Sequence, residues 1–199
     1  MRTVSEDELQ QWLADGKMLE RDGRGPKVVS LADGLFLKIF HTRRHPLLAR
    51  LEPAALRFTR NTEALRERGI AAPQVTETFW LDHKTGLSGC LYTPLAGESI
   101  DRIFRQDAEQ AQRLIPDLAK FIRRLHQSGI YFRSLHLGNV LLLPDGQFGL
   151  IDVLDLKARR GPLNRWLVRR NFSHLRRYLE RTRFQGFPLE RLEHCYWTE

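Results

Sequence analysis

The stretch that decides the fold reads YFRSLHLGN over residues 131–139 and continues as VLLLPDGQFGLID over residues 140–152. The second part has the pattern of a β-hairpin, because two apolar runs flank a Pro-Asp-Gly turn at residues 144–146. Asn139 precedes this hairpin and Asp152 ends it. Mg²⁺ takes oxygen ligands and often only one or two of them from the protein. We therefore predict that Asn139 and Asp152 converge on one Mg²⁺ ion.

The same stretch resembles the catalytic loop and the metal-binding strand end of kinases. In that pattern an Asp accepts the proton of the substrate hydroxyl, and a following Asn and a later Asp bind Mg²⁺. The spacing from Ser134 to Asn139 is that of the pattern, but Ser134 stands where the catalytic Asp belongs. A serine hydroxyl is not basic near neutral pH, and a general base contributes about 10²–10⁴-fold. Some activity could survive, because phosphoryl transfer depends mainly on positioning and charge neutralisation.

Two neighbours of Ser134 are further candidates for the catalytic loop. His136 is the nearest titratable group and could act as the base, since histidine titrates near neutrality. The alternative, which we favour, is that His136 braces the loop. Arg133 is expected to steady the loop or to bind phosphate. Asp155 is a second carboxylate after Asp152, and we expect it to cap a helix or a loop.

Lys38 is the candidate for binding the nucleotide phosphates. It lies in the otherwise apolar run LFLKIF at residues 35–40, on the third expected strand, where a kinase lysine contacts the α- and β-phosphates. The alternative is a lysine that points to solvent. Glu63 on the following helix is the expected ion-pair partner of Lys38, although a solvated helix charge explains Glu63 equally well.

The chain resembles the bacterial lipopolysaccharide kinase family, the Kdo/heptose kinases of the WaaP and InaA (toluene-tolerance) type. The resemblance runs from about Met18 to Tyr178 and rests on residues 57–70, on LHLGN at residues 135–139, and on LID at residues 150–152. The LHLGN run also resembles the loop of aminoglycoside and choline kinases. The resemblance implies ATP and Mg²⁺ as cofactors, and a sugar hydroxyl of lipopolysaccharide as the phosphate acceptor.

The order of expected elements gives an α+β fold class, a minimal protein-kinase-like fold with two lobes. We expect a small antiparallel sheet lobe with one long helix at residues 1–93. A helical lobe with the catalytic hairpin and basic C-terminal helices should follow at residues 94–199, after a hinge at residues 93–97. The expected helices cover residues 6–15, 53–68, 108–127 and 163–183, and the main strands cover 28–31, 35–40, 75–81 and 87–92. In the last of these helices the apolar residues are expected to face inward and the arginines largely outward. The inward set is Leu163, Trp166, Leu167, Phe172, Leu175 and Tyr178, and the outward set is Arg165, Arg169, Arg170, Arg176, Arg177 and Arg181.

The composition of this 199-residue chain indicates which kinds of partner it binds. From Lys157 onward the chain carries eleven basic and four acidic residues, a net charge of +7, against a formal +8 for the whole chain. We expect this basic segment to meet lipopolysaccharide core or another anionic glycolipid, with peripheral contact at the inner membrane. No zinc-finger or RNP-type motif supports nucleic acid as a partner. Two distant cysteines and no apolar N-terminal run favour a cytoplasmic location.

Two functional classes therefore stay open. The first, which we favour, is a kinase that transfers phosphate to an alcohol group. The second is a pseudokinase, a regulatory or scaffold protein that binds nucleotide with little or no transfer, as the loss of the catalytic Asp at Ser134 would suggest.

Overall fold

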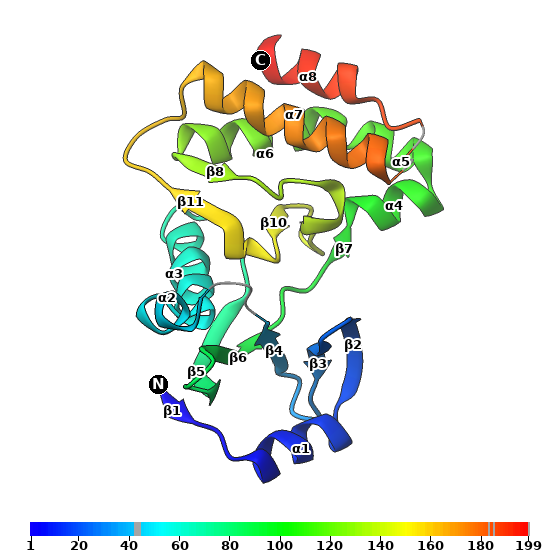
Figure 1. Cartoon of the computed structure of the whole chain (residues 1–199). Helices are drawn as coiled ribbons and strands as arrows, with labels where there is room; N and C mark the ends of the chain where they lie inside the picture. Colours follow the sequence, from blue (N-terminus) through cyan, green and yellow to red (C-terminus); the bar gives the residue numbers. More distant parts are fainter. Residues whose placement is uncertain (42–44, 183, 185, 199) are drawn as a thin grey trace. The chain divides into compact units, whose positions relative to one another are not determined.

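The computed structural model describes residues 1–41, 45–182, 184 and 186–198. The chain forms two compact units with an α+β composition (Figure 1). The first unit comprises Met1–Glu63 and Pro73–Pro94, and the second comprises Ala64–Ala72 and Leu95–Glu199.

The first unit is built on a six-stranded sheet in the order β1-β5-β6-β4-β3-β2. Every neighbouring pair is antiparallel except β1 with β5, which is parallel. The expected strands are present. The strands are β1 (Arg2–Thr3), β2 (Lys17–Asp22), β3 (Gly25–Ser30), β4 (Phe36–Phe40), β5 (Gln74–Asp82) and β6 (Leu87–Thr93).

Three helices accompany this sheet: α1 (Glu6–Asp15), α2 (Pro46–Leu51) and α3 (Ala54–Arg66). Helix α1 begins as predicted, because the Ser5 side chain accepts a hydrogen bond from the backbone N–H of Glu8 at 3.2 Å. Helix α2 was not predicted. The helix has only six residues, which is too short for a helical spacing of apolar residues to be recognised in the sequence.

A buried apolar cluster holds the first unit together. Val29, Leu37 and Phe79 are fully buried on three strands of this sheet. The centre of the Trp12 ring of α1 lies 5.3 Å from that of the Phe79 ring. Burial of such side chains typically contributes about 1.5–3 kcal/mol each. The cluster therefore fixes β4, the strand that carries Lys38, within its sheet.

The second unit begins with helices α4 (Ile100–Gln106), α5 (Ala108–Arg113) and α6 (Ile115–Gln127). The prediction of one helix over residues 108–127 was wrong, because the chain breaks at Leu114. Pro116 explains the break, since proline lacks an N–H and clashes with the preceding turn, but is tolerated in a first helical turn. Helix α4 was not predicted.

Short strands deliver the catalytic-loop segment. Strands β9 (Val140–Leu142) and β10 (Phe148–Leu150) form the predicted hairpin, and β7 (Glu98–Ser99) pairs with β9. Strand β8 (Ile130–Phe132) pairs with β11 (Leu156–Ala158), so that Leu156 lies opposite Phe132. Two 3₁₀ turns, η1 (Leu137–Asn139) and η2 (Val153–Asp155), complete the segment.

Helices α7 (Arg165–Arg181) and α8 (Leu189–Thr198) complete the second unit near α6 (Figure 1). Leu167, Phe172 and Leu175 of α7 are buried as predicted. Trp166 was predicted to point inward, and this was wrong, because 62% of its surface is exposed. Its six predicted outward arginines, Arg165, Arg169, Arg170, Arg176, Arg177 and Arg181, are all exposed. Among the described helices, none combines the length and apolarity that a membrane crossing requires.

Candidate active site

The catalytic hairpin brings Asn139 and Asp152 to the same end of the second unit. Leu150 lies opposite Val140 in the ladder, and the backbone N–H of Ile151 donates to the Asn139 carbonyl at 3.0 Å. Asn139 precedes β9 and Asp152 follows Ile151, so the two side chains start from adjacent strand ends. The hairpin therefore sets the backbones of Asn139 and Asp152 side by side, and their binding of a metal ion stays a prediction.

Asp152 has an unusual backbone. Its φ is 53° and its ψ is 42°, and among the described residues other than glycine it alone has a positive φ. This left-handed conformation disfavours most side chains, although Asp tolerates it better than most residues do. Strained positions of this kind cluster at functional sites. The strain is an observation that points to a role for Asp152 beyond packing.

The donor set of this hairpin end fits Mg²⁺. Asn139 is buried, and its Nδ2 donates to the Ser134 carbonyl at 3.0 Å and lies 3.2 Å from His136 Nε2. Both contacts use Nδ2, so Oδ1 is the amide atom that can face a cation. Together with the Asp152 carboxylate it offers hard oxygen ligands, as Mg²⁺ requires. Among the described residues, no group of three or more His, Cys, Asp or Glu side chains is arranged to hold a metal ion.

Ser134 has an unexpected partner. Its hydroxyl donates a hydrogen bond of 2.6 Å to Asp155 Oδ2, which is at the short end of the O–H···O range. Arg133 Nε lies 3.5 Å from the same oxygen. The expectation that Asp155 caps a helix or a loop was wrong, because its carboxylate holds the side chain of Ser134 at the position of the missing Asp.

The pairing of β8 with β11 explains this contact. Leu156 lies opposite Phe132, so the next antiparallel position sets Asp155 opposite Arg133, beside Ser134. Asp155 was not proposed as a site residue, because residues 130–132 and 156–158 are too short to be recognised as paired strands from the sequence. Only the three-residue spacing from Asp152 could have drawn attention to it.

His136 lies against a helix. Its ring stacks on the Tyr178 ring of α7 with centroids 4.1 Å apart and an angle of 5° between the planes. Burial lowers the pKa of His136, while Asp152 acts in the opposite direction. Nε2 faces the Asn139 amide, and the buried Nδ1 has no hydrogen-bond partner among the described residues. This geometry fits a neutral ring that braces Asn139.

A cavity of about 770 Å³ opens beside the loop within the second unit. Its lining contains three arginines, two histidines and one carboxylate. The polar residues that line it are Arg133, Ser134, His136, His174, Arg177, Tyr178, Glu180 and Arg181. The pKa of His174 is lowered, first by burial and then by the positive charges of Arg170, Arg133 and Arg177. The cavity therefore has a positive local potential next to Ser134.

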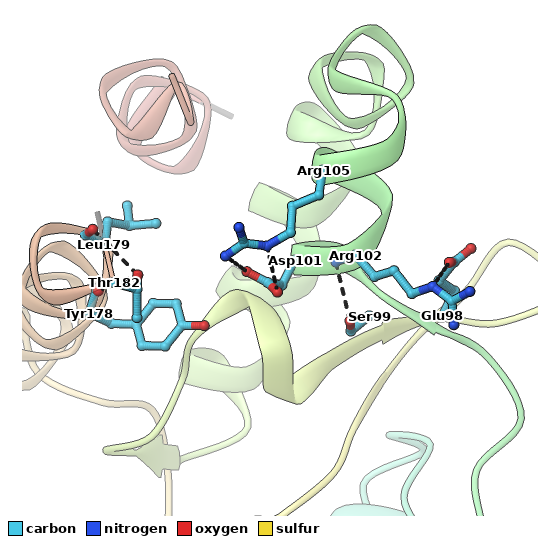
Figure 2. A network of polar contacts seen from close by, with 8 residues as sticks. All are labelled: Glu98, Ser99, Asp101, Arg102, Arg105, Tyr178, Leu179 and Thr182. Carbon is cyan, nitrogen blue, oxygen red and sulfur yellow. Dashed lines mark hydrogen bonds and ion pairs between the residues drawn. The ribbon is translucent and has the colours of Figure 1, made fainter. Parts of the chain in front are cut away.

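Helix α4 contributes a charged network near this cavity (Figure 2). Arg105 pairs with Asp101 at 3.2 Å, and Arg102 pairs with Glu98 at 2.9 Å. Figure 2 shows the Tyr178 hydroxyl pointing toward the Asp101–Arg105 pair. The pKa of Tyr178 is raised by burial and by Asp101. The phenol is therefore neutral near pH 7, and its ring stacks on the His136 ring.

Lys38 and Glu63 belong to the first unit. Lys38 is 5% exposed, and its Nζ lies 5.6 Å from the centre of the Phe58 ring and 6.0 Å from that of Phe40. The alternative of a lysine that points to solvent is therefore excluded. On α3, Asn61 is buried while Glu63 is exposed. The pairing of Glu63 with Lys38 stays a prediction.

A comparison with protein-family models identifies the family to which this chain belongs. Residues 22–187 match the model of the phosphotransferase enzyme family (APH). The match covers most of the chain, and the chain therefore belongs to this family, which confirms the kinase-like α+β fold. A search of curated proteins finds no significant match.

Proposed function

We propose that this protein transfers the γ-phosphate of ATP to a sugar hydroxyl of lipopolysaccharide core or of a similar anionic glycolipid. Membership of the phosphotransferase family supports the reaction class. Lys38 would contact the nucleotide phosphates. Asn139 and Asp152 would hold Mg²⁺, which when bound neutralises the charge on the phosphate oxygens.

The observation that carries the choice of acceptor is the basic cavity beside Ser134. Arg133, Arg177 and Arg181 contribute three positive charges to its lining, against one from Glu180 of opposite sign. Arginine binds phosphate and carboxylate oxygens in a bidentate manner. A phosphorylated or carboxylated sugar is the acceptor chemistry that this lining favours. A neutral sugar would make no use of the surplus of positive charge in this lining.

The acceptor proposal is tested with Arg177→Gln. This change should raise the KM for a phosphate-bearing core oligosaccharide, while the KM for MgATP stays unchanged. Arg169→Gln removes the same charge from the same helix, but Arg169 does not line the cavity. It should leave both constants at their wild-type values. Equal effects of the two variants would assign the charge effect to the helix as a whole.

Contact with an anionic membrane surface is a further part of the proposal. Trp166 is exposed on α7, with the Arg170 guanidinium 5.1 Å from its ring centre, and Arg165 lies 5.5 Å from the ring of the exposed Trp197. Tryptophan next to basic residues suits the interface of an anionic bilayer. Binding to vesicles with anionic lipid should weaken with salt and should decrease in Trp166→Ser. Binding that strengthens with salt would contradict this.

A pseudokinase is the second candidate, favoured by one observation, the serine at position 134. A pseudokinase would bind MgATP without transfer to any core sugar. Calorimetric titration with MgATP, followed by an assay for the phosphate ester, separates the two candidates. We favour the kinase, because Lys38, Asn139 and Asp152 are all present.

A further inference from the structure

Ser134 sits between the cavity and a carboxylate. Ser134 is among the residues that line the cavity, whereas Asp155 is not. The Ser134 hydroxyl donates to Asp155 Oδ2 at 2.6 Å. A group that reached Ser134 from the cavity would therefore meet an oxygen whose proton already points at a carboxylate.

We propose that Ser134 and Asp155 together replace the missing catalytic Asp. Ser134 Oγ takes the proton of the acceptor hydroxyl while its own proton passes to Asp155 Oδ2. This inference rests on the proposed phosphotransfer to a hydroxyl. It assigns a proton-transfer function to a carboxylate of η2, the turn that precedes β11.

The step balances in atoms and charge. The acceptor oxygen forms a bond to the γ-phosphorus of ATP while the bond from that phosphorus to the ADP oxygen breaks. The acceptor proton moves to Ser134, and the former Ser134 proton ends on Asp155, which becomes neutral. Because the two proton movements are coupled, the serine never has to carry a full negative charge. Asp155 returns its proton to solvent after the products leave.

The surroundings of the pair hold it in place. The β8–β11 ladder sets the backbone of Asp155 opposite that of Arg133. The Ser134 carbonyl accepts from Asn139 Nδ2, which ties the serine to the predicted metal ligand. Arg133 Nε lies 3.5 Å from Asp155 Oδ2, so a positive charge stands beside the carboxylate. Ser134 and Asp155 each lie within two residues of this ladder, which limits how far their backbones can move apart.

The decisive test moves the carboxylate. Asp155→Asn keeps the size of the side chain and an oxygen that can accept from Ser134, so a purely structural role would survive it. We expect kcat for transfer to core oligosaccharide to fall by about 10²–10⁴-fold, with the MgATP affinity and the thermal midpoint unchanged. Ser134→Asp combined with Asp155→Asn restores a carboxylate at the kinase position. This double variant should recover turnover that Asp155→Asn alone has lost.

Two comparisons complete the design. Ser134→Ala should lose about as much as Asp155→Asn, and the combination of these two changes should lose little more, since groups that act as a unit are not additive. Asp117→Asn on α6 removes an exposed carboxylate that lies 3.3 Å from Lys120 Nζ and does not line the cavity, and it should behave as wild type.

The outcomes separate this inference from the proposed function. Turnover in Asp155→Asn equal to wild type overturns the relay and leaves the phosphotransferase function intact. An inactive wild type that becomes active as Ser134→Asp with Asp155→Asn overturns the relay and identifies a pseudokinase. If wild type and the double variant both bind MgATP without transfer, the proposed function and the relay are both wrong. Loss in Asp155→Asn with recovery in the double variant supports the relay.

Discussion

Two histidine clusters of the second unit show how differently similar residues are used. His126 of α6 is buried, with Nδ1 2.9 Å from Tyr196 Oη of α8 and Nε2 3.2 Å from Asn171 Oδ1 of α7. His136 lines a cavity, stacks on Tyr178 and contacts a predicted metal ligand. Burial lowers the pKa of both rings. Both rings are therefore neutral near pH 7, but only the first has both nitrogens satisfied.

The difference separates stability from function. The His126 cluster joins three helices and reaches the catalytic segment, because Asn171 Nδ2 donates to the Phe132 carbonyl of β8 at 2.6 Å. In the His136 cluster the buried Nδ1 has no partner among the described residues, and the charge of Asp152, the residue with the positive φ, acts on the ring. We infer that substitutions in the His126 cluster lower the stability of the fold. Substitutions in the His136 cluster should instead change the binding of ATP and of the acceptor.

Asp152→Asn should give the largest functional effect. The change removes a negative charge from the predicted Mg²⁺ site, and even partners of metal ligands typically contribute about 10–100-fold. We expect transfer to fall by more than about 100-fold, with Mg²⁺-dependent ATP binding weakened in a calorimetric titration. The thermal midpoint without nucleotide should not decrease. Wild-type ATP affinity in the presence of Mg²⁺ would argue against the site.

Asn171→Ala should give the largest effect on stability. It leaves the Phe132 carbonyl and one nitrogen of His126 without their buried partner, and each such group costs about 1–3 kcal/mol. We expect the free energy of unfolding in urea to fall by about 3 kcal/mol. Ser173→Ala, two residues along the same helix, should stay within about 0.5 kcal/mol of wild type. Similar values for the two variants would refute the structural role of the His126 cluster.

Acid should weaken the same cluster. Burial lowers the pKa of His126 from 6.5 to about 4, so the unfolded chain binds a proton that the folded protein does not. The stabilisation is complete above pH 6.5 and is lost as the pH falls toward 4. Between pH 7.5 and pH 5 the contribution of His126 should fall by about 2 kcal/mol. His126→Gln does not titrate, so a pH dependence equal to wild type in that variant would refute the assignment.

His136→Phe should give the smallest effect of the four. Phenylalanine keeps a ring against Tyr178, and such ring pairs contribute about 0.5–1.5 kcal/mol, so stability should change little. The contact with Asn139 is lost, and we expect transfer to fall by about tenfold, as for other partners of metal ligands. Complete loss of turnover, together with full activity of Asp155→Asn, would instead identify His136 as the base.

The hairpin could be predicted from the sequence because its signals are local. Two apolar runs around Pro-Asp-Gly predicted β9 and β10. The positions of Asn139 before this hairpin and Asp152 at its end then predicted that the two residues lie close together. The break before Ile115 was missed because apolar periodicity was followed through Pro116. Trp166 was placed inward because it is apolar, although its position on α7 faces solvent.

Asp155 shows the limit of such reading. Its role depends on the pairing of β8 with β11, two three-residue strands far apart in the chain. Neither strand has a recognisable period of its own, and the tertiary contact alone gives Asp155 its place. The basic cavity was missed in part for the same reason. The outward arginines of α7 were predicted, but their position beside Ser134 follows from the packing of α7 on the loop.

The most direct test of the account is the reaction of the wild-type protein with MgATP and a phosphate-bearing core oligosaccharide. Mass spectrometry of the oligosaccharide should show one added phosphate group, whose appearance requires the protein, Mg²⁺ and the acceptor together. MgATP binding by calorimetry without any phosphorylated product, across acceptors with and without anionic groups, would contradict the proposed phosphotransferase function.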